Sequence, residues 1–165
     1  MTITEQKAAQ RKAGIAARRA LSDTERTRSN AALCARIMAL DCFKKAENIL
    51  LYAAFGGEAD LSALAVKAAR QGKTLAYPVC GEGFSLTAAV PGPDGWEVGA
   101  YGIRTPILSR SAVLPPDRLD LVLVPCTAFD TACRRVGMGK GYYDRYLPRC
   151  TRAVKIGVAF EAQRV

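Results

Sequence analysis

The chain has 165 residues, half of them hydrophobic and 24% charged, and its 24 Lys and Arg against 15 Asp and Glu give a formal net charge of +9. This length and composition indicate one soluble globular domain over residues 1–165, and the longest apolar runs are too short to span a bilayer. There is no histidine and no C-x-x-C pair among the six cysteines, which excludes most transition-metal sites and every histidine-based nucleophile.

The N-terminal segment and the net charge indicate the cellular location and the class of ligand. The segment MTITEQKAAQRK is polar and lacks the apolar core of a signal peptide, so we expect a cytoplasmic protein with reduced thiols. A net charge of +9 attracts anions such as nucleotides, polycarboxylates or nucleic acid. The basic residues are spread along the chain, which weakens the nucleic-acid interpretation. Any metal ion should be a hard, oxygen-bound one such as Mg²⁺.

Helices and short apolar strands are predicted to alternate along the chain. The patterns predict helices over residues 3–20, from the Ser22–Glu25 capping box to about Leu40, from Asp60 to Gln71, and over Tyr142–Tyr146. Strands are expected at residues 48–54, 74–78, 84–90, 119–124 and 153–160, with an irregular segment at 96–116. Strands that are apolar throughout and alternate with helices predict a mostly parallel sheet covered on both faces.

The segment RRVGMGKGYYDRYL, residues 134–147, lies between a buried strand and a helix start. Its glycines at 137, 139 and 141 allow positive φ and let backbone amides converge on an anion, and Arg135 and Lys140 add positive charge. The candidate ligand is a phosphate chain at the helix N-terminus, with Asp144 within reach of a magnesium ion carried on it. Neither the Walker A motif nor G-x-G-x-x-G is present, so a simple structural turn is an equal alternative.

Two stretches together resemble a known family. They are Val124–Asp130, VPCTAFD, and Arg135–Arg145, RVGMGKGYYDR, and they are similar to the signature of the 5-formyltetrahydrofolate cyclo-ligases, also called methenyltetrahydrofolate synthetases. The similarity extends to the helix with Lys7 and Arg11, the strand with Tyr52 followed by Glu58, the Tyr101-Gly-Ile segment, and Ala159-Phe160. It implies an α/β fold, a three-layer α/β/α sandwich with a mostly parallel, Rossmann-like sheet, which agrees with the prediction from the elements.

The resemblance also implies a reaction. ATP phosphorylates the formyl oxygen of 5-formyltetrahydrofolate, the neighbouring N10 atom attacks the activated carbon, and phosphate leaves. The products are 5,10-methenyltetrahydrofolate, ADP and phosphate. Such phosphoryl transfer depends on positioning and charge neutralisation and requires no histidine.

Roles for individual residues follow from the same resemblance. The metal ligand would be Asp144, and the catalytic residues would be Arg135, Lys140 and Tyr143. The residues expected to bind ATP are Lys7, Arg11, Arg135, Gly137, Met138, Gly139, Lys140, Gly141, Tyr142 and Tyr143. Those expected to bind the folate are Tyr52, Ala53, Glu58 and Tyr101.

Each of these residues also has a structural alternative. Lys7 and Arg11 share a helical face with Arg18, and basic residues on an exposed helix are usually solvated; the resemblance favours a binding role for the first two only. Glu58 would otherwise be a surface acid, and Tyr101 would pack beside Trp96. Asp144 would be a helix N-terminal carboxylate, and Tyr142 and Tyr143 would be core residues with satisfied hydroxyls.

The sequence departs from the family pattern at several positions. Cys126 and Cys133 stand where glycine is usual, and Thr105 stands where an acidic residue is frequent. Family members continue past the stretch that corresponds to Ala159–Gln163 with another acidic residue near the metal. We therefore expect a domain short at its C-terminus: either the sequence is a piece of a longer chain, or its magnesium site is incomplete.

Three functions remain open at this stage. The first is an ATP- and Mg²⁺-dependent cyclo-ligase that acts on small molecules as a monomer, without nucleic acid or membrane partners. The second is a catalytically impaired nucleotide- or folate-binding or regulatory protein of the same fold. The third is a basic RNA-binding module, which would place aromatic residues among surface cations, whereas here they gather around glycine turns.

Overall fold

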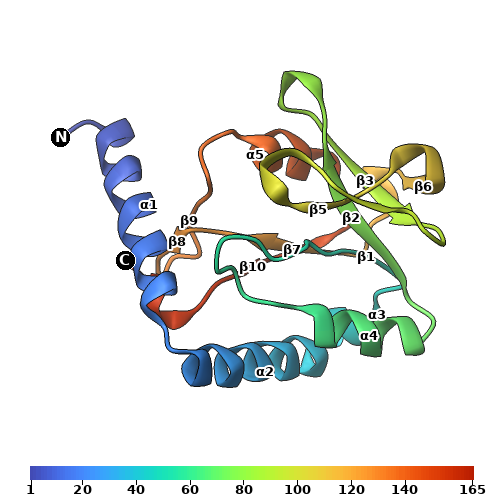
Figure 1. The fold of residues 1–165 in the computed structure, drawn as a ribbon, viewed down its shortest axis with the longest axis horizontal. Coiled ribbons are helices and arrows are strands. Elements are labelled where there is room, and N and C mark those ends of the chain that lie inside the picture. Colours follow the sequence, from blue (N-terminus) through green and yellow to red (C-terminus); the bar gives the residue numbers. More distant parts are fainter.

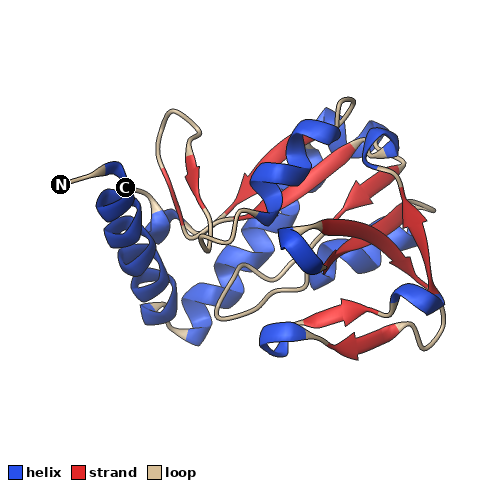
Figure 2. Cartoon of the chain, turned by 90° about the horizontal axis from the view of Figure 1, so that it is seen from above, coloured by secondary structure: helices blue, strands red, loops and turns tan.

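A six-stranded sheet lies between helices in the computed structural model, which describes residues 1–165 apart from the side chain of Ala100 (Figures 1 and 2). The strand order is β10-β7-β1-β2-β3-β6. The first four strands pair in parallel, and β3 and β6 extend the sheet in antiparallel fashion. The strands are β1 (Asn48–Leu50), β2 (Thr74–Cys80), β3 (Leu86–Pro91), β6 (Ser111–Leu114), β7 (Leu121–Pro125) and β10 (Val154–Val158). The predicted mostly parallel α/β/α architecture is confirmed.

Two hydrophobic cores cover the two faces of this sheet, because alternate residues of a strand point to opposite faces. Ile49 and Leu121 belong to the core beneath α2, α3 and α4, whereas Leu50 and Val122 belong to the core beneath α5, where they meet Tyr146. The covering helices are α2 (Asp23–Ala39), α3 (Asp41–Lys45), α4 (Ser62–Arg70) and α5 (Tyr142–Tyr146). No helix among the described residues combines the length and the apolar character of a membrane span.

Helix α1 (Ile3–Ala20) stands apart from both layers, at the end of the sheet where the parallel strands finish (Figure 1). It begins with the capping box of Thr2 and Glu5 and packs against the small hairpin of β8 (Ala128–Phe129) and β9 (Arg135–Val136). Gly14 lies at the closest approach, where a Cβ atom would overlap the carbonyl oxygen of Thr127. The helix therefore reaches the edge of the sheet because one of its residues has no side chain.

Several predicted boundaries are wrong. The strand expected at 48–54 ends at Leu50, and the Leu51 N–H makes one further bond, to the carbonyl of Ala76 at 2.9 Å; beyond it Tyr52 is buried and Ala54 is exposed. Asp60 is not the cap of α4, since it lies one residue before the N-cap and its carboxylate accepts the Ser62 N–H at 2.9 Å. The segment 96–116 is not irregular: it contains the hairpin of β4 (Trp96–Val98) and β5 (Arg104–Pro106), and then β6. Strands of two to four residues separated by turns show too little alternation to be detected.

Gly14 gives a test of this packing. In an ordinary helix interior, Gly→Ala stabilises by roughly 1 kcal/mol. Gly14→Ala should instead destabilise the protein by about 1–3 kcal/mol, because the added methyl group forces α1 away from the backbone of Thr127. Urea unfolding of the variant and of the wild type measures this difference, and a stabilised Gly14→Ala protein would contradict the packing described.

Candidate functional site

The glycine loop, residues 137–141, follows β9 and ends at the first turn of α5. Gly139 and Gly141 have φ angles of 97° and 75°, which side chains rarely adopt. Arg11 Nε donates to the carbonyl oxygen of Gly137 at 2.7 Å, and Arg145 Nη1 donates to those of Lys140 and Gly141 at 3.1 Å each. Two arginines from different helices therefore fix the carbonyl groups of this loop.

The amide groups of the glycine loop are free. In the described part of the chain, no protein group accepts a hydrogen bond from the backbone N–H of residues 137–141. Several unpaired amides in one loop form a concave site for an anion. The helix that follows has only five residues, so the amides and the surrounding cations, rather than a long helix dipole, supply the attraction.

Arg135 links the glycine loop to the first turn of α5. Its Nη2 atom lies 2.8 Å from Asp144 Oδ1, and its guanidinium carbon lies 5.7 Å from the centroid of the Tyr143 ring. The side chains of Lys7 and Lys140 are exposed, and Met138 is exposed at the loop tip. The structure thus brings Arg11, Arg135 and the loop together, while Lys7 lies one turn earlier on α1 without a described partner.

Tyr143 faces inward from the same turn. Its hydroxyl is buried, and among the described residues it has no hydrogen-bond partner. Burial raises the pKa of Tyr143, with a further contribution from the nearby carboxylate of Glu58, so the hydroxyl stays protonated and can donate to a ligand. The predicted alternative of a satisfied core tyrosine does not describe Tyr143.

The second loop of the site, residues 55–58, follows β1. Gly56 and Gly57 both have positive φ, and their carbonyl oxygens point toward α1 and α2. Arg18 Nε donates to Gly56 at 3.0 Å, and Arg26 Nη1 donates to Gly57 at 2.9 Å. The two glycine loops of the site are therefore held in the same way, by arginines bonded to carbonyl groups.

Glu58 closes the second loop with a largely buried carboxylate, whose side chain is 13% exposed. Its Oε2 accepts the N–H of Phe55 at 3.0 Å, and its Oε1 lies 3.9 Å from Arg18 Nη1. Burial raises the pKa of Glu58, although the Phe55 N–H and Arg18 partly offset this effect. Glu58 is thus not the surface acid of the alternative interpretation; it is an acceptor facing the interior of the site.

The other residues predicted to bind a folate lie in different surroundings. Tyr52 is 5% exposed and its hydroxyl donates to the carbonyl of Ala59 at 2.8 Å, so only its backbone remains for a ligand; Ala53, next to it, is half-buried. Tyr101 is 62% exposed and has a positive φ of 61°. Trp96 packs against Tyr77 and beneath Arg104 instead, which leaves Tyr101 available for stacking.

Cys126 and Cys133 stand at the two positions where glycine was expected. Cys126 is buried behind the site, its thiol donates to the carbonyl of Val158, and burial raises its pKa to about 11. Cys133 adopts the left-handed conformation with φ of 60° in the β8–β9 turn, which the carboxylate of Asp130 stabilises through the N–H groups of Ala132 and Arg134. The turn is therefore kept despite the missing glycine.

The acidic residues of the site suit magnesium only in part. Among the described residues, no three His, Cys, Asp or Glu side chains gather closely enough to hold a metal ion by themselves. Asp144, 77% exposed beside the glycine loop, is a single carboxylate. Because Mg²⁺ in proteins is commonly held by one or two carboxylates together with substrate phosphates, Asp144 fits an ion that arrives with a nucleotide.

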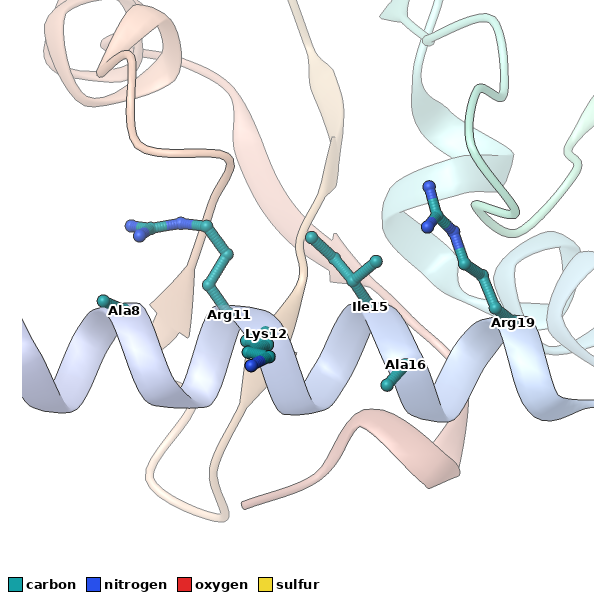
Figure 3. A pocket seen from close by; sticks show the side chains of 6 residues that line it. All are labelled: Ala8, Arg11, Lys12, Ile15, Ala16 and Arg19. Carbon is teal, nitrogen blue, oxygen red and sulfur yellow. The ribbon is translucent and has the colours of Figure 1, made fainter.

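A groove of about 400 Å³ runs along the flank of α1 (Figure 3). The side chains of Arg11, Ile15 and Arg19 project to one side of the helix, with Arg11 directed toward the glycine loop. The groove therefore adds a cationic surface with an aliphatic centre beside the free amides.

Sequence reasoning missed three of the arginines that build this site. Arg18 was noted on the face of Lys7 and Arg11 but received no role, and Arg26 and Arg145 were not considered. Of these three arginines, only Arg18 could have been found from the sequence, because it is two helical turns from Arg11 and therefore lies on the same face of the helix. The loop carbonyls that Arg18 and Arg26 bind, those of Gly56 and Gly57, are more than 30 positions away along the chain, so no local pattern reveals these contacts.

Known proteins match this chain over most of its length. The sequence model of the 5-formyltetrahydrofolate cyclo-ligase family matches residues 3–165. The 5-formyltetrahydrofolate cyclo-ligase of Haemophilus influenzae is 32% identical over 127 residues, which cover 74% of this chain and 68% of the relative. That of Escherichia coli K12 is 29% identical over 153 residues, covering 90% and 84%. The NMR structure of Aquifex aeolicus 5,10-methenyltetrahydrofolate synthetase superposes with a TM-score of 0.83 at 35% identity, covering 96% of this chain and 79% of that one.

The left-handed turn at position 133 gives a prediction about stability. Cys133→Gly should raise the free energy of unfolding by about 1 kcal/mol, because a Cβ atom at positive φ costs roughly that much. Ala132→Gly, one residue earlier and without positive φ, should lower it by a few tenths to about 1 kcal/mol. Denaturant unfolding compares the two, and equal losses in both variants would contradict the turn geometry.

Proposed function

The chain belongs to the 5-formyltetrahydrofolate cyclo-ligase family, and we propose that it uses ATP with Mg²⁺ to close the ring of 5-formyltetrahydrofolate, giving 5,10-methenyltetrahydrofolate, ADP and phosphate. The family itself implies an enzyme that makes the methenyl product. One observation supports the finer proposal most strongly: the glycine loop has free amides with Arg11 and Arg135 beside them, and Tyr143, in the turn that follows, faces the carboxylate of Glu58.

The glycine loop is suited to the phosphate chain of ATP. Its free amides can donate to phosphate oxygens, while Arg11, Arg135 and Lys140 supply charge around them. A phosphoryl group in transfer carries negative charge spread over three oxygens, and donors fixed in advance stabilise that charge without reorganisation. Arg11 and Arg145 provide this fixation, since they hold the loop through its carbonyl groups.

The folate would occupy the space between Glu58, Tyr143 and Tyr101. The carboxylate of Glu58 can accept N–H groups from the edge of a pterin ring, and the free hydroxyl of Tyr143 can donate to a substrate oxygen. The exposed ring of Tyr101 offers a surface for stacking. These side chains hold the formyl oxygen toward the glycine loop, where the phosphoryl group would be.

The proposed chemistry balances with groups that the substrates supply. The formyl oxygen attacks the γ-phosphorus and the bond to ADP breaks; N10 then attacks the activated carbon and loses its proton, and the former formyl oxygen leaves as part of the phosphate, which takes up that proton. A Mg²⁺ ion beside Asp144 would neutralise part of the phosphate charge. The acceptor oxygen is a weak nucleophile, so the contribution of the protein is to align it with the phosphorus and to exclude water.

A second candidate function is binding of ATP and folate without turnover. It is favoured by the single carboxylate of Asp144, which is already paired with Arg135. The absorbance of methenyltetrahydrofolate, formed from 5-formyltetrahydrofolate with ATP and Mg²⁺, separates the two. Product formation supports the cyclo-ligase, whereas binding of both ligands without product supports the impaired protein.

Lys140 and Asp144 provide the test of the assigned roles. Lys140→Ala and Asp144→Asn should each lower kcat/KM by about a hundredfold or more, because each removes a charge that acts on the phosphates. Both side chains are exposed, so the fold should be retained. Lys155→Ala and Asp117→Asn, exposed residues elsewhere on the surface, are the controls. Wild-type rates from both site variants would defeat the assignment.

The raised pKa of Glu58 predicts how folate binding depends on pH. Glu58 loses its charge as the pH falls through a pKa that lies above the usual value for glutamate, so affinity for 5-formyltetrahydrofolate should weaken on the acidic side earlier than for an ordinary carboxylate. Calorimetric titrations between pH 5 and 8 should show this loss of folate affinity at acidic pH in the wild type, and the pH dependence should disappear in Glu58→Gln. Glu47→Gln, an exposed carboxyl at the opposite end of β1, should leave it in place. Identical pH profiles for wild type and Glu58→Gln would contradict the role of Glu58.

A further inference from the structure

We propose that Arg18 is the positioning residue for Glu58: from α1 it holds the loop that carries this carboxylate and faces the carboxylate itself, and so prepares Glu58 for the pterin ring. This inference rests on the proposed function for the identity of the ligand. The pairing of the two side chains, however, can be tested without turnover.

Arg18 is the one arginine among the described residues that is buried, with 2% of its surface exposed. Its Nε atom donates to the carbonyl of Gly56, whereas its Nη1 atom is buried and has no hydrogen-bond partner in the described part of the chain. The carboxylate oxygen Oε1 of Glu58 lies 3.9 Å from that Nη1, beyond hydrogen-bonding distance but within ion-pair distance. The Nε group of Arg18 therefore binds the loop, and its Nη1 group faces Glu58.

A role in loop anchoring alone does not account for a buried guanidinium. Arg26 already binds the loop through Gly57, and its Nη2 also donates to the carbonyl of Arg18 at 2.6 Å. Burying a charge is costly unless it is paired, and a donor left without a partner adds to that cost. A bound ligand would offset this cost, because it could pair with the free Nη1 donor of Arg18 and with the carboxylate of Glu58.

The surroundings of Glu58 show that Arg18 is its main source of positive charge. The titratable groups that face it are Arg18 from α1, the hydroxyl of Tyr52 after β1, the hydroxyl of Tyr143 in the first turn of α5, and the thiol of Cys126 after β7. The Phe55 N–H supplies the remaining donor. Of these groups, only Arg18 carries a charge at neutral pH, so its removal should leave Glu58 ionised only at higher pH.

Helix α1 connects this arrangement to the nucleotide side. Arg11 and Arg18 lie on the same face, two turns or about 10 Å apart, and each binds a carbonyl of a different glycine loop. The helix thereby fixes the spacing between the free amides and Glu58. Arg18 should consequently affect the folate more than the nucleotide, because its own contacts are on the side of Glu58.

The experiment compares Arg18→Met with Arg28→Met, an exposed arginine on α2, and with Glu58→Gln and the Arg18→Met/Glu58→Gln double variant. Carboxylate ¹³C NMR gives the titration midpoint of Glu58, and calorimetry gives the affinity for 5-formyltetrahydrofolate and for ATP. Arg18→Met should raise the midpoint by about one pH unit and weaken folate binding about tenfold at pH 7. ATP affinity should change less than about twofold, and Arg28→Met should change nothing.

In the Glu58→Gln background, Arg18→Met should weaken folate binding by no more than about twofold, since the two residues act as a unit. Additive losses, or an unchanged midpoint of Glu58, would overturn the proposal. If Arg18→Met fails to fold, Arg18→Lys replaces it: the single nitrogen of lysine cannot occupy both the Nε position that binds Gly56 and the Nη1 position that faces Glu58, so wild-type folate affinity in this variant would also overturn the proposal. A wild type that makes no methenyl product would refute the proposed reaction, while the midpoint and folate affinity would still decide the role of Arg18.

Discussion

Hydrogen bonds from arginine side chains to backbone carbonyls determine the shape of the site. Arg11 and Arg145 bind carbonyls of the glycine loop, and Arg18 and Arg26 bind those of Gly56 and Gly57. Glycine loops are flexible and would otherwise populate many conformations. Fixing their carbonyls leaves the amides of one loop and the carboxylate of the other available to the proposed ligands. Part of the net charge of +9 is therefore structural. Arg11, Arg18, Arg26 and Arg145 fix the conformations of the two loops, besides attracting anions.

These bonds join parts of the chain that are distant in sequence. The N-terminal helix reaches β8 because Gly14 permits close contact, and it then ties residues near position 56 to residues near position 137. Gln163 contributes from the other end of the chain, where its buried amide donates to the carbonyls of Cys126 and Thr127. The candidate site therefore combines α1, the segments that follow β1 and β7, and the C-terminal turn.

Local patterns in the sequence predicted the elements with strong local signals. The capping box at Ser22 and the helix Tyr142–Tyr146 are where the sequence pattern placed them, since these signals depend on residues three or four positions apart. The glycine loop was predicted as a candidate phosphate site because its alternating glycines lie beside cations, with a simple structural turn as an equal alternative. The features that the sequence did not predict depend on contacts between distant residues. They are the two- and three-residue strands, which exist only through pairing, and the burial of Arg18, whose side-chain partners lie 38 or more positions away.

Backbone ¹⁵N NMR of the protein during addition of a non-hydrolysable ATP analogue and Mg²⁺ tests most directly whether the glycine loop is an anion site. We predict that the amide resonances of residues 137–141 shift most and that these N–H groups become protected from hydrogen exchange, because they donate to phosphate oxygens instead of water. Amides of α4, which covers the opposite face of the sheet from α5, should hardly move. If the nucleotide bound while the amides of 137–141 kept their positions and exchange rates, the phosphates would lie elsewhere and the account would be wrong.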